Sequence, residues 1–217
     1  LIITPTKTYN PSNEFDEEYF EFGLFMSRRE YKTINRRLQQ GRLASVKEGK
    51  WVANVAPYGY ERVRLTDSKG FTLKPVPEEA DVISLIFRYY TQGKIDAEGK
   101  YKQMGMTLIA RELNQMKIPS RSGHPWTIST IKDILQNPVY IGKVRWGYRP
   151  NIKAVNDGQI SKSRPKQKEY ALYPGLHQPL VEIEVWDKVQ KIIKSRYNKP
   201  IPSKKIIQNP LSGLVYC

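Results

Sequence analysis

A long stretch without proline, from residue 14 to about residue 40, constrains the fold of this chain more than any other feature. Apolar residues recur in it at steps of three and four, which is the spacing of an amphipathic helix. Asn13 can cap the start of the helix, and acidic residues fill its first turn. A helix of about 27 residues would be roughly 40 Å long. That is long for a globular domain in a chain of 217 residues.

The charge of this predicted helix changes sign along its length. Its start is acidic, whereas its second half is basic and includes Arg28, Arg36 and Arg37. One interpretation is a surface helix whose charges match its dipole. The other is a helix that packs on a partner at its start and meets phosphates at its end. The sequence leaves both open.

The chain as a whole is strongly basic. It holds 36 Lys and Arg against 21 Asp and Glu, which gives a net charge of +15. Such an excess favours a polyanionic partner, namely DNA, RNA or an anionic membrane. No stretch approaches the roughly 18–20 apolar residues that span a bilayer. The basic residues are also spread over helices, loops and strands. Nucleic acid is therefore the favoured partner, and no membrane contact is expected.

The hydrophobic periods and the turn signals predict a mainly α chain with small β elements, an α+β fold. We expect a short strand within 1–10, a hairpin formed by 61–65 and 71–76, strands over 140–146 and 170–173, and helices over 77–92, 107–116, 127–136 and 182–196. Residues 94–102 and 149–168 are expected to be basic loops. Residues 41–57 are expected to be a connector, either a solvated linker or an arm that follows a narrow groove.

The run over 119–127 combines a basic, glycine-containing arm with the start of a short amphipathic helix. The outward positions of that helix are small and polar, which suits a nucleic-acid duplex. With the helix before it, the arrangement resembles a helix-turn-helix, in which the second helix enters the major groove. The connection over 117–126 is longer than the usual turn of three to four residues, so this would be a variant.

Residues for catalysis are hard to find. His124 and His177 both fall in predicted loops without metal-ligand spacing, and no serine sits in a nucleophile motif. The one cysteine, Cys217, is the last residue. It could be an inert thiol or the first ligand of a zinc site. Both ends of the chain suggest a fragment of a longer protein.

Several segments together resemble the large serine recombinases, which include phage integrases and mobile-element transposases. Residues 25–38 are similar to the long helix that closes the family's catalytic domain. Ala56-Pro57-Tyr58-Gly59-Tyr60 is similar to the start of its recombinase domain, and 209–217 to the start of its zinc ribbon. The most recognisable stretch is matched by Ser120-Arg121, Gly123, Trp126-Thr127, Asn137-Pro138, Tyr140 and Gly142.

The resemblance implies three parts: the last strand and closing helix of the catalytic domain with its linker (1–50), the recombinase domain (51–200), and a linker with the truncated zinc ribbon (201–217). It implies that the nucleophilic serine lies outside this chain, so the fragment has no catalytic residue. The parent protein would act in the bacterial cytoplasm. It would cut attachment sites, exchange strands as a tetramer and integrate or excise a mobile element.

The resemblance also implies double-stranded DNA as the partner and self-association of the full-length protein as a dimer or tetramer. The fragment itself would carry no cofactor, whereas the full-length protein would hold zinc, with Cys217 as one ligand. The expected DNA-binding residues are Arg36, Arg37, Arg42, Lys47, Lys50, Trp51, Arg121, Ser122, Gly123, Trp126, Thr127, Ser129, Thr130, Lys132 and Arg145. Two other functions remain open: a stand-alone transcription regulator and an RNA-binding module.

Overall fold

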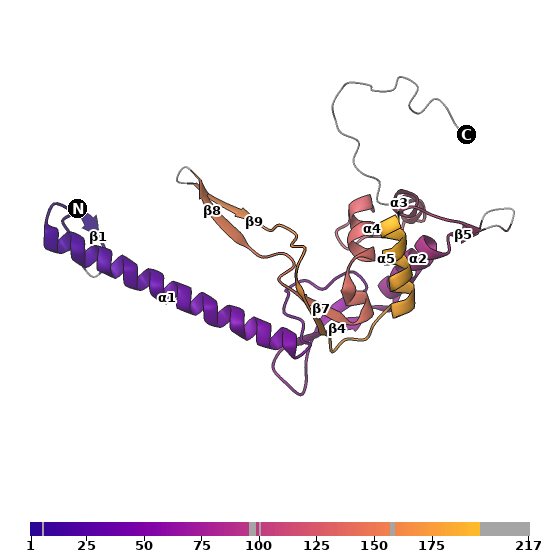
Figure 1. Ribbon diagram of the computed structural model, residues 1–217, viewed down its shortest axis with the longest axis horizontal. Helices are drawn as coiled ribbons and strands as arrows, with labels where there is room; N and C mark the ends of the chain where they lie inside the picture. Colours follow the sequence, from indigo (N-terminus) through magenta and orange to yellow (C-terminus); the bar gives the residue numbers. More distant parts are fainter. Residues whose placement is uncertain (6, 96–98, 100, 157–158, 196–217) are drawn as a thin grey trace, which may run out of the picture.

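The computed structural model describes residues 1–195 except 6, 96–98, 100 and 157–158. A single long helix, α1 (Glu14–Lys47), extends away from a helical body that is built from the described residues after it (Figure 1). At 34 residues, α1 has a length of about 51 Å. A short hairpin of β1 (Ile2–Ile3) and β2 (Thr8–Tyr9) lies at its far end.

The start of α1 follows from its cap and its charges. The side chain of Asn13 accepts a hydrogen bond from the backbone N–H of Phe15 at 3.0 Å. Asp16 in the first turn accepts from Lys7 Nζ at 2.9 Å, and this pair ties the β1–β2 hairpin to the helix. Acidic groups at this end also complement the helix dipole.

The end of α1 lies seven residues beyond the predicted boundary, so the prediction of a connector was wrong for 41–47. The extension has a tertiary cause. Val46 is fully buried, and the last turns pack on β7 and β10. The helix stops where Gly49 adopts a φ of +78°. A Cβ at that position would lie 2.8 Å from the carbonyl oxygen of Pro174, so the exit from the helix requires glycine.

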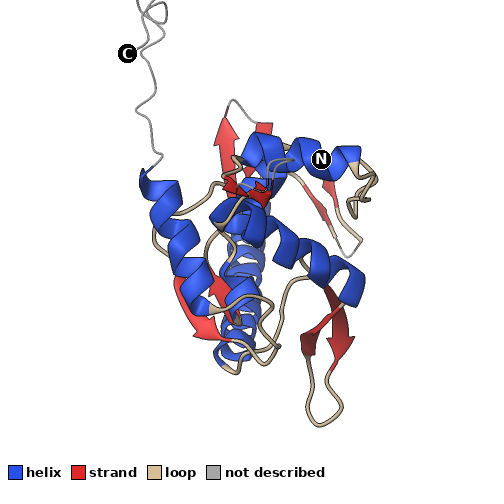
Figure 2. Ribbon diagram, turned by 90° about the vertical axis from the view of Figure 1, so that its right-hand side faces the viewer, coloured by secondary structure: helices blue, strands red, loops and turns tan. Residues whose placement is uncertain are grey.

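The body is built from four helices and a set of two-stranded antiparallel ribbons (Figure 2). The helices are α2 (Pro77–Thr91), α3 (Met106–Gln115), α4 (Ile128–Leu135) and α5 (Ile183–Ser195), with a 3₁₀ turn, η1 (Pro138–Ile141), after α4. The ribbons pair β3 (Tyr60–Arg64) with β4 (Phe71–Pro75), β5 (Lys94–Ile95) with β6 (Tyr101–Lys102), β7 (Lys143–Trp146) with β10 (Ala171–Pro174), and β8 (Ile152–Asn156) with β9 (Gln159–Ser163). The predicted α+β class is confirmed.

The core lies between α2, α3, α4 and α5, and aromatic rings fill its centre. Tyr60 and Tyr140 stack at 6.1 Å between ring centroids, and Phe87 contacts both Tyr140 and Trp186. The phenol groups find backbone acceptors: Tyr60 donates to Gln178 at 2.7 Å, and Tyr140 to Tyr58 at 2.9 Å. Burial raises the pKa of both phenols. Tyr60 and Tyr140 therefore tie the β3–β4 ribbon and η1 into the core.

Three further boundaries differ from the sequence predictions. The predicted strand over 140–146 begins only at Lys143, because Pro138 and the capping side chain of Asn137 favour a 3₁₀ turn first. The predicted loop over 94–102 contains β5 and β6, and the predicted loop over 149–168 contains the β8–β9 hairpin. That hairpin projects from the body on the same side as α1 (Figure 1).

Candidate nucleic-acid interface

A groove forms where the end of α1 meets the body. Its walls come from α1, the segment 51–53, the end of α4 with η1, and the chain from β7 to residue 151. It brings together three residues that sequence reasoning had placed in separate segments: Arg42, Trp51 and Arg145. The described basic residues that line it are Arg42, Lys143, Arg145, Arg149 and Arg164. A single concave surface therefore collects positive charge from distant parts of the chain.

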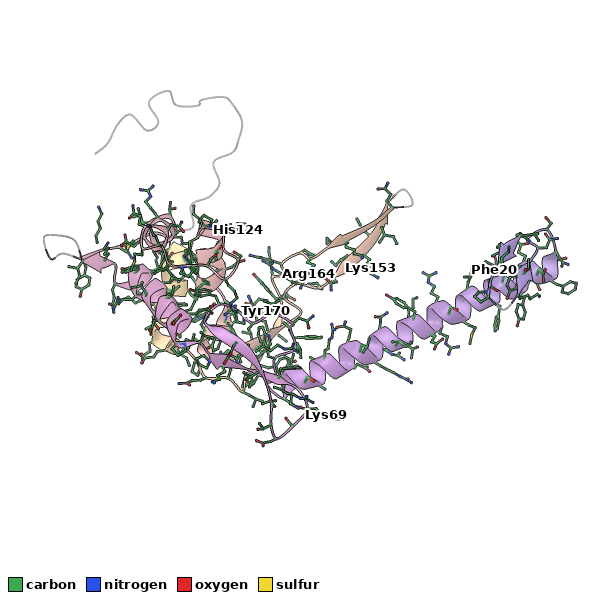
Figure 3. The ribbon with its side chains drawn as sticks, turned by 180° about the vertical axis from the view of Figure 1, so that it is seen from behind. Phe20, Lys69, His124, Lys153, Arg164 and Tyr170 are labelled. Carbon is green, nitrogen blue, oxygen red and sulfur yellow. The ribbon has the colours of Figure 1, made fainter. Side chains whose placement is uncertain are left out.

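Arg145 is the most firmly held of these charges. It lies on β7, and its guanidinium is 4.1 Å from the ring centroid of Tyr148. Tyr148 packs edge-on against Tyr170 at 5.1 Å. Burial lowers the pKa of Arg145 from its ordinary value, but guanidinium stays charged at neutral pH. Figure 3 shows Arg164 and Tyr170 between the body and the β8–β9 hairpin. The groove thus has a pre-arranged cation among its lining residues.

Trp51 lines the wall of the groove next to α1, and Lys50 precedes it in the chain. The backbone N–H of Trp51 donates to Phe71 at 2.7 Å, and its ring packs against the core. Its indole Nε1 is buried and has no hydrogen-bond partner within the described structure. Lys50 Nζ pairs with Glu48 at 2.6 Å, and its side chain is 15% exposed. Lys50 is therefore less available to a phosphate than the exposed Lys47.

Arg121 does not point outward as a base-reading side chain. Nε donates to Glu79 at 3.2 Å, and Nη2 donates to the same carboxylate and to the carbonyl of Tyr60 at 2.8 Å. Nη1 donates to the carbonyls of Ala56 at 2.9 Å and Pro57 at 3.2 Å. A guanidinium has five N–H donors, and these contacts use all five. In this structure Arg121 fastens the arm to the body, and the predicted base contact has no free donor.

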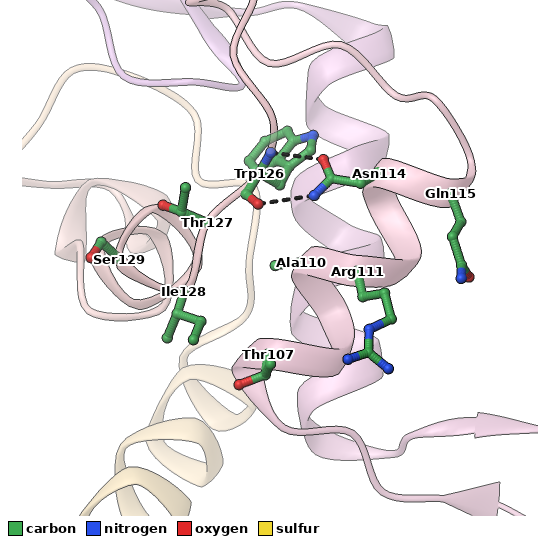
Figure 4. Close-up of a pocket in the computed structure, with 9 residues that line it drawn as sticks. All are labelled: Thr107, Ala110, Arg111, Asn114, Gln115, Trp126, Thr127, Ile128 and Ser129. Atoms are coloured by element: carbon green, nitrogen blue, oxygen red, sulfur yellow. Dashed lines mark hydrogen bonds between the residues drawn. The ribbon is translucent and has the colours of Figure 1, made fainter.

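Trp126 is also an internal residue, with 4% of its surface exposed. Its backbone N–H donates to Asn114 Oδ1 at 2.7 Å, and Asn114 Nδ2 donates to its carbonyl at 3.0 Å (Figure 4). The indole Nε1 donates to Ile118 at 2.9 Å, and the ring packs edge-on against Tyr58 at 5.0 Å. In this structure the indole of Trp126 has a packing role, because it is buried and its N–H is satisfied; its contact with DNA stays a prediction.

The outer face of α4 keeps the small, polar character that the sequence predicted. Thr127 caps the helix by accepting from the backbone N–H of Thr130 at 3.3 Å, and the two hydroxyl groups lie 3.0 Å apart. Ser129 and Lys132 are exposed. Thr127 and Ser129 also line a shallow pocket with Arg111 on α3 (Figure 4). Of the α4 residues that were predicted to bind DNA, Ser129 and Lys132 therefore have the side chains most available to a partner.

The remaining predicted residues lie apart from the groove or at its margin. Arg36 and Arg37 are exposed on α1, one to two turns before Arg42. Ser122 and Gly123 lie at the exposed tip of the arm, where Gly123 adopts a φ of +73°. Sequence reasoning missed Arg111 on α3 and Lys143 at the groove. Arg149 and Arg164 lie in the 149–168 segment, which was recognised as basic.

Within the described residues, no group of three or more His, Cys, Asp or Glu side chains could hold a metal ion. Cys217 and the predicted start of a zinc ribbon lie outside those residues. Among the described helices, none combines the length and apolar character needed to cross a bilayer.

The fold and the groove define a basic α+β domain with a long helical arm. Residues 77–196 match the family model described as Recombinase. The match covers more than half of the chain, so the chain belongs to the Recombinase family. This agrees with the resemblance to large serine recombinases that its motifs carry. The matched range lies inside the predicted 51–200 domain, whose boundaries stay a prediction.

The chain is similar to known proteins, among them a curated relative and two solved structures. A protein of Bacillus subtilis (strain 168) named "Putative DNA recombinase" is 29% identical over 207 residues, which is 92% of this chain but 38% of the relative. A structure of an "LSR-DNA Complex" is 19% identical, covers 73% of this chain and 38% of that chain, and has a TM-score of 0.47. A structure concerned with the Listeria innocua prophage attP site is 20% identical, covers 73% and 51%, and has a TM-score of 0.45.

Proposed function

We propose that this chain binds duplex DNA at specific sites and forms the target-recognition part of a site-specific serine recombinase. The observation that carries the proposal is the basic groove beside α4. There Arg42 lines a common space with Arg145 and Arg149, which follow it about a hundred residues later in the sequence. A concave, positively charged surface bordered by a polar helix is suited to a phosphate backbone with bases next to it.

The proposed roles follow from exposure and partners. The end of α1 contacts phosphates through Arg36, Arg37, Arg42 and Lys47, because these side chains are exposed along one basic helix end. Arg145 and the other groove cations contact the same backbone. Ser129 and Lys132 read bases from α4, with Ser122 and Gly123 at the arm tip beside them. Trp126 and Arg121 hold this reading unit in shape.

The whole protein would use this recognition to integrate or excise a mobile element, with the nucleophilic serine in a separate domain. The chain spans 38% of the curated relative it matches, so these wider activities belong to the proposal. Zinc binding through Cys217 is proposed in the same sense, on the likeness of 209–217 to the start of a zinc ribbon.

Self-association is proposed from the surface of α1. Phe15, Tyr19, Phe22 and Met26 follow one another at steps of four, three and four, and each is exposed. Such a stripe on an isolated helix is typical of a helix–helix contact. We propose that it packs against a second copy in the full-length protein. Sedimentation of the full-length protein and of a Phe22→Glu variant tests this, and an unchanged mass would overturn it.

The DNA-binding proposal is tested by selection from a pool of random duplexes, followed by titrations of the selected duplex, a random duplex and a single-stranded RNA over a range of salt. We expect enrichment of a defined sequence and a linear fall of log affinity with log salt. Enrichment of no sequence would overturn the proposed specificity. Tighter binding of the RNA would favour an RNA-binding module instead.

A further inference from the structure

The basic groove contains one acidic residue among its described lining residues, Asp133. It lies on α4, on the side that faces the groove, and its side chain is 52% exposed. Its carboxylate lies 2.6 Å from Lys166 Nζ and 3.5 Å from a terminal guanidinium nitrogen of Arg149. A single carboxylate on the proposed reading helix therefore engages two cations from another segment.

Both of those cations belong to the chain that carries the β8–β9 hairpin, on either side of it. Arg149 precedes β8 and Lys166 follows β9. Their side chains remain 43% and 45% exposed, so a second anion can reach them. A phosphate diester carries the same single negative charge as a carboxylate and accepts the same hydrogen bonds. Asp133 thus occupies, for these two cations, the position that a DNA phosphate would take.

We propose that Asp133 determines specificity by competing with DNA phosphates for Arg149 and Lys166. The inference rests on the proposed function and names a residue that regulates the same groove. On a random duplex, Asp133 keeps both cations partly neutralised and repels the nearest phosphate. On the correct site, base contacts from α4 hold the helix where Asp133 lies farther from the nearest phosphate, so the repulsion is weaker there. The effect is to lower affinity for random DNA more than affinity for the cognate site.

The variant Asp133→Asn removes the charge and keeps the size of the side chain. Exposed ion pairs contribute up to about 1 kcal/mol, which corresponds to about a fivefold change in affinity. We expect affinity for a random duplex to rise about three- to fivefold and affinity for the selected duplex to rise less. The log–log salt slope on random DNA should steepen by about one to two, because each added phosphate contact contributes about 0.9.

The matched control is Asp187→Asn on α5, an exposed carboxylate that does not line the groove. It makes the same change in net charge. Equal effects of the two variants on both duplexes would mean that net charge alone matters, and would overturn the proposal. The proposal would also be overturned if Asp133→Asn raised the affinity for random and selected DNA equally, and by more than Asp187→Asn does. A third outcome would overturn it as well. If Asp133→Asn lowered the affinity for the selected duplex and left the affinity for the random duplex unchanged, Asp133 would be reading a base.

A double-mutant cycle with Lys166→Gln gives a second, independent readout. In the parent chain, Lys166→Gln should change random-DNA affinity little, because Asp133 already engages that cation. In the Asp133→Asn background, the same change should lower affinity about threefold or more. Equal effects in both backgrounds would contradict the proposal. Should the parent chain show no preference for any duplex, the proposed function fails instead, and thermal melting shows whether each variant is folded.

Discussion

Glu79 and Arg121 are joined side chain to side chain across the domain, although they are 42 residues apart in the sequence. The same carboxylate accepts a hydrogen bond from the backbone N–H of Gly59 at 2.8 Å. The arm over 119–126 is therefore fixed to α2 and to the start of the β3–β4 ribbon. Its position next to α4 depends on a contact inside the protein.

Arg121→Ala is expected to lower the free energy of unfolding by about 1–3 kcal/mol, because it leaves Glu79 and several carbonyls without their donors. Arg121→Lys should rescue little, since an ammonium cannot replace a planar guanidinium with five donors. Chemical denaturation measures both. A folded Arg121→Ala variant with unchanged stability and a relaxed base preference would restore the original assignment of Arg121 as a base reader.

Trp126→Phe should destabilise the domain without changing the electrostatics of DNA binding. The variant loses the hydrogen bond from indole Nε1 to Ile118 and leaves a smaller ring against Tyr58. A loss of about 1–3 kcal/mol is expected for a buried acceptor left unpaired together with lost packing. Thermal melting measures the loss, and the salt slope of DNA binding should stay the same. A flatter slope at unchanged stability would show a direct contact with DNA.

Lys47 and Lys50 lie close together at the end of α1 but differ in exposure, so their variants can be compared directly. Lys47 is exposed, whereas Lys50 is largely covered and paired with Glu48. Lys47→Gln should reduce the log–log salt slope by about 0.9, the value for one phosphate contact. Lys50→Gln should reduce it less. Titrations with a random duplex at several salt concentrations check this, and a larger effect of Lys50→Gln would contradict the placement of α1 on the backbone.

His177 predicts a pH dependence of stability. It is buried at 6% exposure, with Nε2 2.8 Å from the carbonyl oxygen of Val139. Burial lowers its pKa in the folded state, and the hydrogen bond offsets this only in part. The unfolded chain thus binds the proton more readily. Stability should be complete above the ordinary histidine pKa of about 6.5 and should fall as the pH drops below it.

Denaturation midpoints between neutral and mildly acidic pH measure this effect. The loss cannot exceed about 1.4 kcal/mol per pH unit for one group. His177→Gln should flatten the profile in this window. The exposed His124 offers a control, and His124→Gln should leave the profile as it is. If the denaturation midpoint of the parent chain stays the same from neutral to mildly acidic pH, the lowered pKa of His177 is contradicted.

The helices of the body could be predicted from the sequence because their apolar residues recur with a clear helical period. Ile83, Ile86 and Phe87 on α2 and Ile131 and Leu135 on α4 are all buried. The true end of α1 was not accessible, because Val46 packs against strands that follow about a hundred residues later. The β8–β9 hairpin had a signal, since Asp157-Gly158 is a dipeptide typical of hairpin turns.

The site was only partly predictable for a related reason. Sequence patterns indicated which segments are basic, but not which cations are already paired. Arg121 looks free in the sequence because its acceptors lie up to 65 residues away. Trp126 looks like part of an exposed arm, yet Asn114 and Ile118 hold it in the core. The groove itself exists only after α1, α4 and β7 come together.

The most direct test of the account is the salt dependence of duplex binding by Arg145→Gln. Arg145 is the half-buried cation at the groove, and Lys102→Gln on the β6 strand, far from α1 (Figure 1), is the control. We expect weaker binding and a salt slope lower by about one for Arg145→Gln, with the control close to the parent chain. Equal slopes for all three folded proteins would contradict the claim that this groove binds DNA.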